Sequence, residues 1–405
     1  MMKTPPTPEQ ILRKTIAQAR KAAWKGWDPY DALSSPLVRA SSFNLPVLRT
    51  AWIQLFKRSP VNLRPLTANP KLENPKALAL FASAAWEIAP LWNREAETIA
   101  HEILDRIQRL AIRQGGQVSW GYPFDWQSRA FFAPRNTPNV IVTTFCGHAF
   151  LDGFEGSRDE HYLAEAVGAC RFIIGSLQQT TRGNSLCFSY TPLDRSRIHN
   201  ANLLAASLLE RTAEVTGHSE FRQAAEQALQ YSLEAQNADG SWPYGEASNQ
   251  RWIDGFHTGF NLMALHAMAQ GPWRNRIMSA LSSGYAYYNN TFFLEDGTPR
   301  YFSNNTYPID IHSAAVAILT FHALSNEFPG ARSKARQVLS WTLAHLYNTR
   351  RQTFIYQKGR FYDIRISYLR WADAWMARAL STHITAESLA AKEPHGSYAS
   401  SRLPD

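Results

Sequence analysis

Residues 311–325 read IHSAAVAILTFHALS, a stretch that is apolar on nearly every side of a helix. Its opening, Ile311 and His312, has a counterpart at 198–212, which reads IHNANLLAASLLERT, and another at 256–270, which reads FHTGFNLMALHAMAQ. In each stretch an apolar residue and a histidine precede a small or polar residue and a long apolar run. A helix that is apolar all round is buried, so the three stretches predict inner helices of a repeated structure.

The same pattern extends to both sides of these stretches. IVTTFCGHAFLDGFE begins at residue 141, and SYLRWADAWMARALS begins at residue 367. The corresponding positions are Val142, His199, His257, His312 and Tyr368, which lie 57, 58, 55 and 56 residues apart. A constant spacing of this size is typical of a fold built from successive pairs of helices.

Segments with one-sided apolar periodicity lie between the apolar ones. At 95–114, 159–177, 219–236, 273–289 and 331–347, apolar residues recur every three or four positions, which is typical of helices at a surface. Apolar helices are expected near 76, 138, 200, 256, 311 and 367, and the N-terminal region (8–25 and 45–58) can supply the missing outer helix. The sequence therefore predicts an all-α fold, an (α/α)6 toroid, with a stacked helical solenoid as the alternative.

We expect three parts along the chain. Residues 1–70 are predicted to form a helical extension that packs on the toroid, 71–385 the toroid itself, and 386–405 a flexible C-terminal tail. Hydrophobic residues make up 45% of the chain and charged residues 19%, which indicates a protein with a packed core. The apolar runs are too short to cross a bilayer, the N-terminus does not resemble a secretory signal, and three cysteines form no disulfide framework. These features predict a cytoplasmic location.

The formal net charge of +9 has two interpretations. One is a scattered basic surface, and the other is an anionic partner. No compact nucleic-acid-binding motif accompanies the charge, so we do not expect nucleic acid as a partner and favour a saccharide or polysaccharide of anionic character. The cysteines and histidines do not form a metal-binding motif, and we expect neither a metal nor another cofactor. The oligomeric state is not predicted.

The links from each outer helix to the next inner helix are long and aromatic. They include VSWGYPFDWQ (118–127), GSWPYGE (240–246) and TFIYQKGRFYD (353–363), whereas a link in the other direction is as short as GHS (217–219). Long loops on one face of a rigid scaffold are where binding sites are commonly built. We therefore expect a site, with short strands around it, at the end of the toroid where the inner helices begin.

Carboxylates, imidazoles, guanidinium groups and aromatic rings gather at these positions. The candidate catalytic residues are Asp125, Glu246, Asp254, His257 and Asp310. The candidate substrate-binding residues are Tyr122, Trp126, Arg129, His199, Asn200, Tyr244, Trp252, Tyr301, His312, Arg365, Tyr368 and Arg370. An aromatic cleft with a few convergent polar groups is typical of small-molecule sites and suits a sugar ring.

Two chemistries fit this set of residues. Glycoside hydrolysis needs two carboxyl groups, and the sequence does not select the pair. A lyase or C5-epimerase acting on a uronic acid needs a base, such as His257 or a tyrosine, and a cation, such as Arg129, Arg365 or Arg370, that neutralises the sugar carboxylate.

Purely structural roles compete with these catalytic ones. Asp254 and Asp310 precede helix starts and can be simple N-caps, and the recurring histidines can support the repeat. A non-catalytic glycan-binding or assembly subunit is the alternative to an enzyme.

The segment GYPFDWQSRAFFAPRNTPNVIVTTFCGHAFLDGFE (121–155), together with DGSWPYGE (239–246) and WIDGFHTGFNL (252–262), resembles a family of bacterial proteins found with exopolysaccharide biosynthesis genes. The resemblance covers roughly residues 75–382. It implies a six-hairpin toroid and a saccharide-related role, and it transfers no established catalytic residues. Some members bear the label delta-aminolevulinic acid dehydratase. That enzyme is a TIM barrel, and this sequence lacks the alternating strand and helix pattern of such a barrel.

Overall fold

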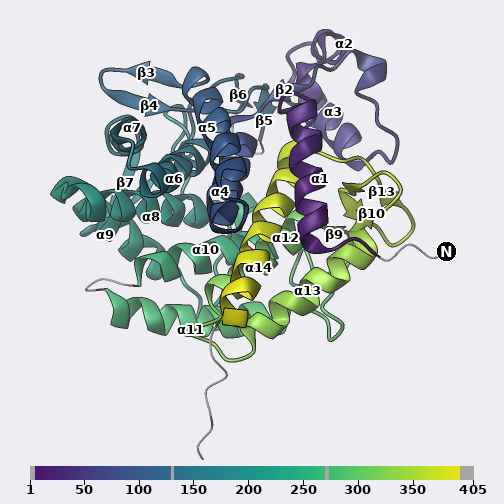
Figure 1. Ribbon diagram of the computed structural model, residues 1–405. Helices are drawn as coiled ribbons and strands as arrows, with labels where there is room; N and C mark the ends of the chain where they lie inside the picture. The colour runs from purple at the N-terminus through teal and green to yellow at the C-terminus, as the bar shows by residue number, and fades with distance from the viewer. Residues whose placement is uncertain (1–4, 129–131, 270–272, 393–405) are drawn as a thin grey trace, which may run out of the picture.

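The computed structural model describes residues 5–128, 132–269 and 273–392. Within them, the inner helices are α4 (Pro75–Trp92), α6 (Val140–Ser157), α8 (His199–Thr216), α10 (Gly255–Met268), α12 (Ile311–Ala323) and α14 (Trp375–Lys392). A π-helical turn, η4 (Leu369–Ala374), leads into α14. Each inner helix contacts the next, and α14 contacts α4, so the helices form a closed ring (Figure 1). The predicted (α/α)6 toroid is confirmed, because a solenoid would leave its first and last helices apart.

An outer helix packs against each inner helix. These are α5 (Arg94–Arg109), α7 (Glu160–Ser176), α9 (Ser219–Leu233), α11 (Arg274–Thr291) and α13 (Ala331–Leu346), each of which contacts the inner helix before it. The N-terminal helix α1 (Pro8–Lys21) packs on α14 and takes the sixth outer position, as the purple and yellow helices of Figure 1 show.

The burial of the two helix types follows their sequences. In α12, every residue from Ile311 to His322 is buried. In α5 the buried residues are Ala96, Ile99, Ala100, Ile103, Leu104 and Ile107, which form a single stripe with charged residues on the other side. Each buried Val, Leu or Ile side chain contributes about 1.5–3 kcal/mol, so the apolar inner ring is the main source of stability.

Side chains at the helix starts satisfy the first backbone N–H groups of several inner helices. Asp254 accepts a hydrogen bond from the backbone of His257 (2.9 Å), and Asp310 accepts one from the backbone of His312 (2.8 Å). Asn139 caps α6 in the same way. Both aspartates are therefore N-caps, each of which stabilises a helix by about 1 kcal/mol.

Short antiparallel strands lie in the links that precede the inner helices. The two-stranded pairs there are β3 (Ile112–Gln114) with β4 (Gln117–Ser119), β5 (Trp126–Gln127) with β6 (Phe132–Ala133), β7 (Gln179–Arg182) with β8 (Ser185–Phe188), and β10 (Tyr347–Asn348) with β11 (Thr353–Phe354). A three-stranded sheet has the order β13 (Asp363–Ile364), β12 (Gln357–Lys358), β9 (Ile309–Asp310). Closer to the N-terminus, β1 (Lys25–Gly26) pairs with β2 (Leu72–Glu73).

The segment between α1 and α4 contains η1 (Asp31–Ser34), α2 (Pro36–Ser41), α3 (Pro46–Arg58) and η2 (Pro65–Thr67). Two buried arginines join it to the last inner helix. Arg64 donates to Asp31 (2.7 Å) and to the hydroxyl of Tyr368 (2.9 Å), and Arg370 donates to both carboxylate oxygens of Asp28 (2.5 and 2.8 Å). Because breaking one partner of a buried pair typically costs about 3–5 kcal/mol, this segment is held firmly against the toroid.

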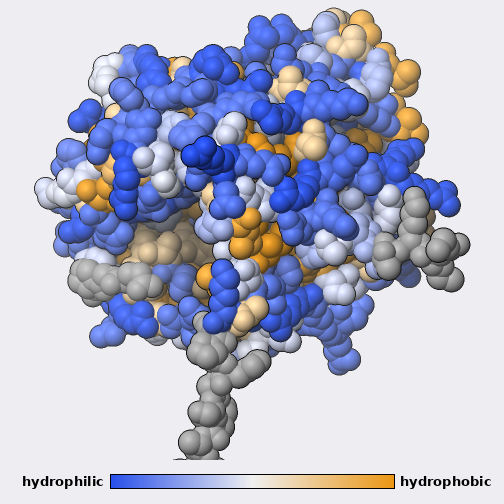
Figure 2. Space-filling model, in the orientation of Figure 1, coloured by the Kyte–Doolittle hydropathy of each residue, from blue (hydrophilic) through white to orange (hydrophobic). Residues whose placement is uncertain are grey.

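The surface seen in Figure 2 is mainly hydrophilic, with apolar side chains gathered at the upper right. Leu37, Phe43 and Leu45, in and after α2, are among the exposed apolar residues. In the described part of the chain, no helix combines the length and hydropathy that crossing a bilayer requires. The division of the chain into 1–70, 71–385 and 386–405 stays a prediction.

Candidate functional site

A cavity of about 750 Å³ opens at the end of the toroid where the inner helices begin. The N-terminal turn of each inner helix contributes to its floor. The contributing residues are Lys76 from α4, Ile141 from α6, Asn200 from α8, His257 from α10, His312 from α12 and Arg370 from η4. The repeat therefore places the starts of its inner helices around one cavity.

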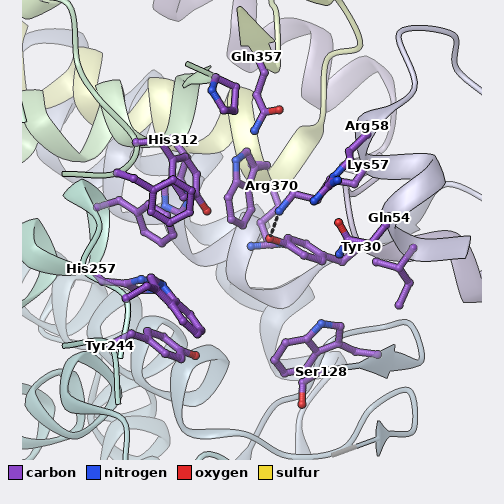
Figure 3. Close-up of a pocket in the computed structure, with 18 of the residues that line it drawn as sticks. Tyr30, Gln54, Lys57, Arg58, Ser128, Tyr244, His257, His312, Gln357 and Arg370 are labelled. Carbon is purple, nitrogen blue, oxygen red and sulfur yellow. Dashed lines mark hydrogen bonds between the residues drawn. The ribbon is translucent and has the colours of Figure 1, made fainter. Parts of the chain in front are cut away.

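Aromatic side chains from the long links form much of the cavity wall. They include Tyr122, Phe124, Trp126, Tyr190, Tyr244, Trp252 and Tyr301. Tyr244 stacks on Trp252 with ring centroids 4.5 Å apart, and its ring centroid lies 4.6 Å from that of His257. In Figure 3 Tyr244 and His257 lie together on one side of the cavity. The space between such rings suits a flat, partly apolar ligand such as a sugar.

The opposite wall comes from the N-terminal segment, which the sequence analysis did not assign to the site. Tyr30 and the α3 residues Gln54, Lys57 and Arg58 line the cavity. Lys57 donates a hydrogen bond to the hydroxyl of Tyr30 (2.8 Å), the dashed line of Figure 3. This segment lies outside the repeat. Its residues therefore could not be identified by aligning them with corresponding positions in other repeats.

His257 forms a dyad with Asp254 at the start of α10. The Nδ1 atom of His257 lies 2.7 Å from Oδ2 of Asp254, which also accepts a hydrogen bond from Nε1 of Trp252 (3.0 Å). The side chain of Asp254 is 1% exposed and that of His257 is 19% exposed. A carboxylate at Nδ1 favours the tautomer with its proton there, which leaves the lone pair of Nε2 available. His257 lines the cavity and can act as a general base.

His312 also lines the cavity but is almost fully buried. Its ring stacks against Phe256 and Trp375, with centroids 4.6 and 4.7 Å apart, and neither ring nitrogen has a hydrogen-bond partner among the described residues. Burial, followed by the charges of Lys76 and Arg370, lowers the pKa of His312 well below its ordinary value. His312 is therefore a neutral imidazole.

Asp310 lies behind the wall and is not among the cavity-lining residues. Besides capping α12, it accepts hydrogen bonds from Gln357 Nε2 (2.7 Å) and Trp371 Nε1 (2.8 Å). Burial raises its pKa to about 6. Gln357 and Trp371 do line the cavity, so Asp310 fixes the position of two wall residues.

Two other candidate carboxylates have partners away from the cavity. Asp125 accepts a hydrogen bond from the backbone N–H of Arg135 (2.7 Å). Glu246 accepts from Arg197 (2.6 Å) and from the hydroxyl of Tyr231 (2.7 Å). Burial acts to raise the pKa of Glu246, but these partners outweigh it and the pKa is lowered. Of the five candidate catalytic residues, only His257 is among the described residues that line the cavity, and none of those lining residues is an Asp or Glu.

The candidate binding residues divide into two groups. Those that line the cavity are Tyr122, Trp126, Asn200, Tyr244, Trp252, Tyr301, His312 and Arg370. His199 is buried beside Tyr231, Tyr368 is bonded to Arg64, and Arg365 is exposed beside Asp363. His199 misses the cavity because it lies one residue before Asn200, and consecutive helical side chains point about 100° apart. Arg129 lies outside the described residues.

The cavity lining is rich in basic side chains. Lys57, Arg58, Lys76, Arg360 and Arg370 line it, and of these five only Arg370 has a carboxylate partner within ion-pair distance among the described residues. A concave site that is lined by charges of one sign and has low-dielectric walls concentrates ions of the opposite sign. Basic side chains around this cavity therefore favour an anionic ligand.

Of the residues on the cavity floor that the sequence analysis missed, Lys76 has the clearest signal in the sequence. It is a lone charge in the apolar stretch PKALALFASAAW (75–86), where an inner helix was expected. In residues 5–128, 132–269 and 273–392, no group of three or more His, Cys, Asp and Glu side chains is arranged to hold a metal ion.

Comparison with known proteins adds evidence on the fold. No protein-family model matches the chain, and no curated protein sequence matches it. A glycoside hydrolase family 76 α-mannanase from Bacteroides thetaiotaomicron superposes with a TM-score of 0.62 at 12% identity, over 78% of this chain and 88% of that one. Cellobiose 2-epimerase from Bacillus thermoamylovorans gives 0.61 at 9% identity, over 78% and 88%. An unsaturated glucuronyl hydrolase specific for heparin gives 0.62 at 11% identity, over 94% and 98%. The chain therefore has the (α/α)6 toroid fold that these glycoside hydrolases and sugar epimerases share.

Proposed function

We propose that the cavity binds an anionic saccharide and that the protein catalyses proton transfer on it, as a uronate lyase or epimerase. The observation that carries the proposal is the Asp254–His257 dyad, which opens on an aromatic cavity with five basic side chains and no carboxylate among its described lining residues. The similar structures lend support, since their names describe enzymes that act on mannan, cellobiose and heparin-derived glucuronyl units.

The positions of the candidate carboxyl groups argue against glycoside hydrolysis. A glycosidase needs one carboxylic acid and one carboxylate on either side of the scissile bond. Asp254 is sealed behind Trp252 and His257, with both oxygens engaged, and Asp310 is buried behind Gln357 and Trp371. Neither is placed to reach a glycosidic oxygen from inside the cavity.

The dyad suits removal of a proton from carbon. Nε2 of His257 would take the proton from C5, next to the sugar carboxylate, and Asp254 would stabilise the imidazolium that forms. A cation beside the sugar carboxylate would stabilise the negative charge that develops there. In a lyase the electron pair of the C5–H bond forms the C4–C5 double bond and breaks the C4–O4 bond, and the O4 group leaves as a hydroxyl with the proton from the His257 imidazolium or from water. In an epimerase C5 takes a proton from water on the opposite face, and the imidazolium returns its own proton to solvent.

The biological setting is part of the proposal. The resemblance of 121–155, 239–246 and 252–262 to proteins found with exopolysaccharide biosynthesis genes points to an exopolysaccharide or envelope glycan as the substrate. A non-catalytic glycan-binding subunit would use the same aromatic walls but would have no need of the dyad.

The test is to incubate the purified protein with uronate-containing oligosaccharides in D2O. Deuterium at C5 of uncleaved chains would identify an epimerase, and a 4,5-unsaturated uronate would identify a lyase. The matched variants are His257→Gln, which should abolish either signal, and His218→Gln, an exposed histidine paired with Glu220, which should not. New reducing ends without deuterium or unsaturation would refute proton transfer in favour of hydrolysis, and binding without any product would favour the non-catalytic subunit.

A further inference from the structure

Three polar side chains on the cavity floor lack hydrogen-bond partners. Lys76, Asn200 and His312 are 3%, 4% and 1% exposed, and all three line the cavity. Among the described residues, Oδ1 of Asn200 and both ring nitrogens of His312 have no partner, and no hydrogen bond or ion pair engages Nζ of Lys76. An unsatisfied buried polar group costs about 1–3 kcal/mol, so three of them at one place indicate a floor built for a polar ligand.

The charge of this floor favours an anion. Nζ of Lys76 lies over the rings of Phe145 and Phe260, 4.2 and 5.6 Å from their centroids, with no carboxylate beside it in the described chain. The neighbouring cation Arg370 is already paired with Asp28. The floor is also made of helix N-terminal turns, whose positive end favours negative charge.

We propose that Lys76, Asn200 and His312 form a subsite for the carboxylate of a uronic acid, with Lys76 as the ion-pair partner. The inference rests on the proposed function, because it names the group of the same saccharide that the floor holds. The ring of Phe256 lies 4.0 Å from that of His257 and 4.6 Å from that of His312, measured between centroids. His257 and His312 therefore contact the same ring, so the proposed base lies next to the proposed carboxylate subsite.

Titration of Lys76 gives this subsite a measurable signature. Burial, followed by the charge of Arg370, lowers the pKa of Lys76 well below its ordinary value, while Asp28 acts in the opposite direction. The other groups that face it are the neutral His312 and the uncharged rings of Phe145 in α6, Phe260 in α10 and Trp375 in α14. A carboxylate bound beside the amine raises its pKa. Binding therefore takes up a proton at any pH between the pKa of the empty site and that of the occupied site.

The experiment is calorimetric titration of the full-length protein with glucuronate, its methyl ester and glucose, in buffers of different ionisation enthalpy. The wild type should prefer glucuronate and take up a proton on binding it. Lys76→Met should weaken glucuronate binding roughly 10- to 100-fold, the value of a charge-assisted hydrogen bond, and should abolish proton uptake. Affinity for the ester should change little. The control Lys71→Met removes a lysine that lies over Trp27, 4.7 Å from the ring centroid and outside the cavity, and should behave as wild type.

Further outcomes distinguish a carboxylate subsite from a purely structural role of the floor residues. If Lys76→Met fails to fold, Lys76→Arg and Asn200→Ala replace it, and the arginine variant should bind glucuronate without proton uptake because its side chain stays charged. Equal wild-type affinity for glucuronate and the ester, or unchanged glucuronate affinity in the variants, overturns the subsite. Lys76-dependent binding with neither deuterium exchange nor a 4,5-unsaturated product would retain the subsite and refute proton transfer. Deuterium exchange or an unsaturated product, with binding that does not depend on Lys76, would refute the subsite and retain proton transfer.

Discussion

The two ends of the inner helix ring differ in whether their charged and polar side chains have partners within the protein. Near the C-terminal ends, Arg211 of α8 pairs with Asp152 and Glu155 of α6, at 2.7 and 2.9 Å. Farther round the ring, Glu87, near the C-terminal end of α4, pairs with Arg378 of α14. At the N-terminal ends, Lys76 and His312 have no such partner in the described chain. The arginines named at one end are paired within the protein, whereas Lys76 and His312 at the other end are not.

The difference separates stability from function. The arginines of the paired end already have carboxylate partners, so these ion pairs stabilise the fold without a ligand. At the other end the available aspartates, Asp254 and Asp310, are used as caps and hold His257, Trp371 and Gln357. Of the basic side chains that line the cavity, all but Arg370 lack a carboxylate partner in the described chain and are left to a ligand. Unsatisfied groups of this kind are a stronger sign of a site than the residue types alone.

The largest expected effect concerns the buried pair that holds the N-terminal segment over the cavity. Asp28→Asn removes the partner of Arg370, whose side chain is 4% exposed, and should lower the free energy of unfolding by about 3–5 kcal/mol. Asp152→Asn at the paired end, where the side chains are 22% and 26% exposed, should lower it by about 1 kcal/mol or less. Urea denaturation of both variants measures the difference, and equal losses would contradict it.

The next effect is on catalysis. His257→Gln should lower turnover of the true substrate at least about 100-fold, because glutamine cannot accept and return a proton. His148→Gln, at the paired end, removes an imidazole that contacts Ser207 and Arg211 and should leave turnover within about twofold. If both variants kept wild-type turnover, the dyad would have no catalytic role.

A smaller but substantial loss is expected for Asp254→Asn. Asparagine caps a helix about as well as aspartate, so the melting temperature should stay within a few degrees. An amide cannot accept from Trp252 and orient His257 at the same time, and turnover should fall at least about tenfold. Asp310→Asn is the comparison in the next repeat and should act mainly on KM, through Gln357 and Trp371. Full activity of Asp254→Asn would leave Asp254 as a cap alone.

The paired end should also contribute to acid sensitivity. Burial, followed by the charge of Arg211, lowers the pKa of His148 to about 3, although Asp152 opposes the shift. In the unfolded chain the imidazole has a pKa of about 6.5 and binds a proton between about pH 6.5 and 3, whereas in the folded protein it stays neutral over this range. The free energy of unfolding therefore falls as the pH drops from about 6.5 towards 3. His148→Gln should make this fall shallower in urea melts at several pH values. His199, whose pKa burial lowers to about 4, contributes in the same direction and keeps the slope from vanishing. An unchanged slope would contradict this assignment.

The fold could be predicted from the sequence because apolar and amphipathic segments alternate at a regular spacing. Inner helices such as 311–325 are apolar on nearly all sides, while outer ones carry a stripe, and both patterns survive without any knowledge of contacts. The position of the site was predictable for the same reason, since His257 and His312 occur at helix starts in register, and Asn200 lies one residue after the corresponding position, His199.

The roles of individual groups were less predictable. Sequence spacing does not show whether Asp254 faces the cavity or lies behind a tryptophan, because both arrangements place it at the same cap. Glu246 lies in a conspicuous aromatic link but is engaged by Arg197 and Tyr231, which come from other parts of the chain. Lys57 and Tyr30 belong to a segment with no counterpart in the repeat. Such assignments depend on contacts between segments distant in sequence.

The smallest expected effect is at the cavity mouth. Phe361 is 89% exposed and lines the entrance, so its ring offers an open face for a sugar beyond the unit held on the floor. Phe361→Ala should weaken binding of a long oligosaccharide about 2- to 10-fold, the value of one aromatic contact, and leave monosaccharide binding unchanged. Phe43→Ala removes a ring that is 75% exposed but outside the cavity, and should change neither. Equal weakening of monosaccharide and oligosaccharide binding would place Phe361 beside the floor unit instead, because only a residue that touches that unit affects both ligands alike.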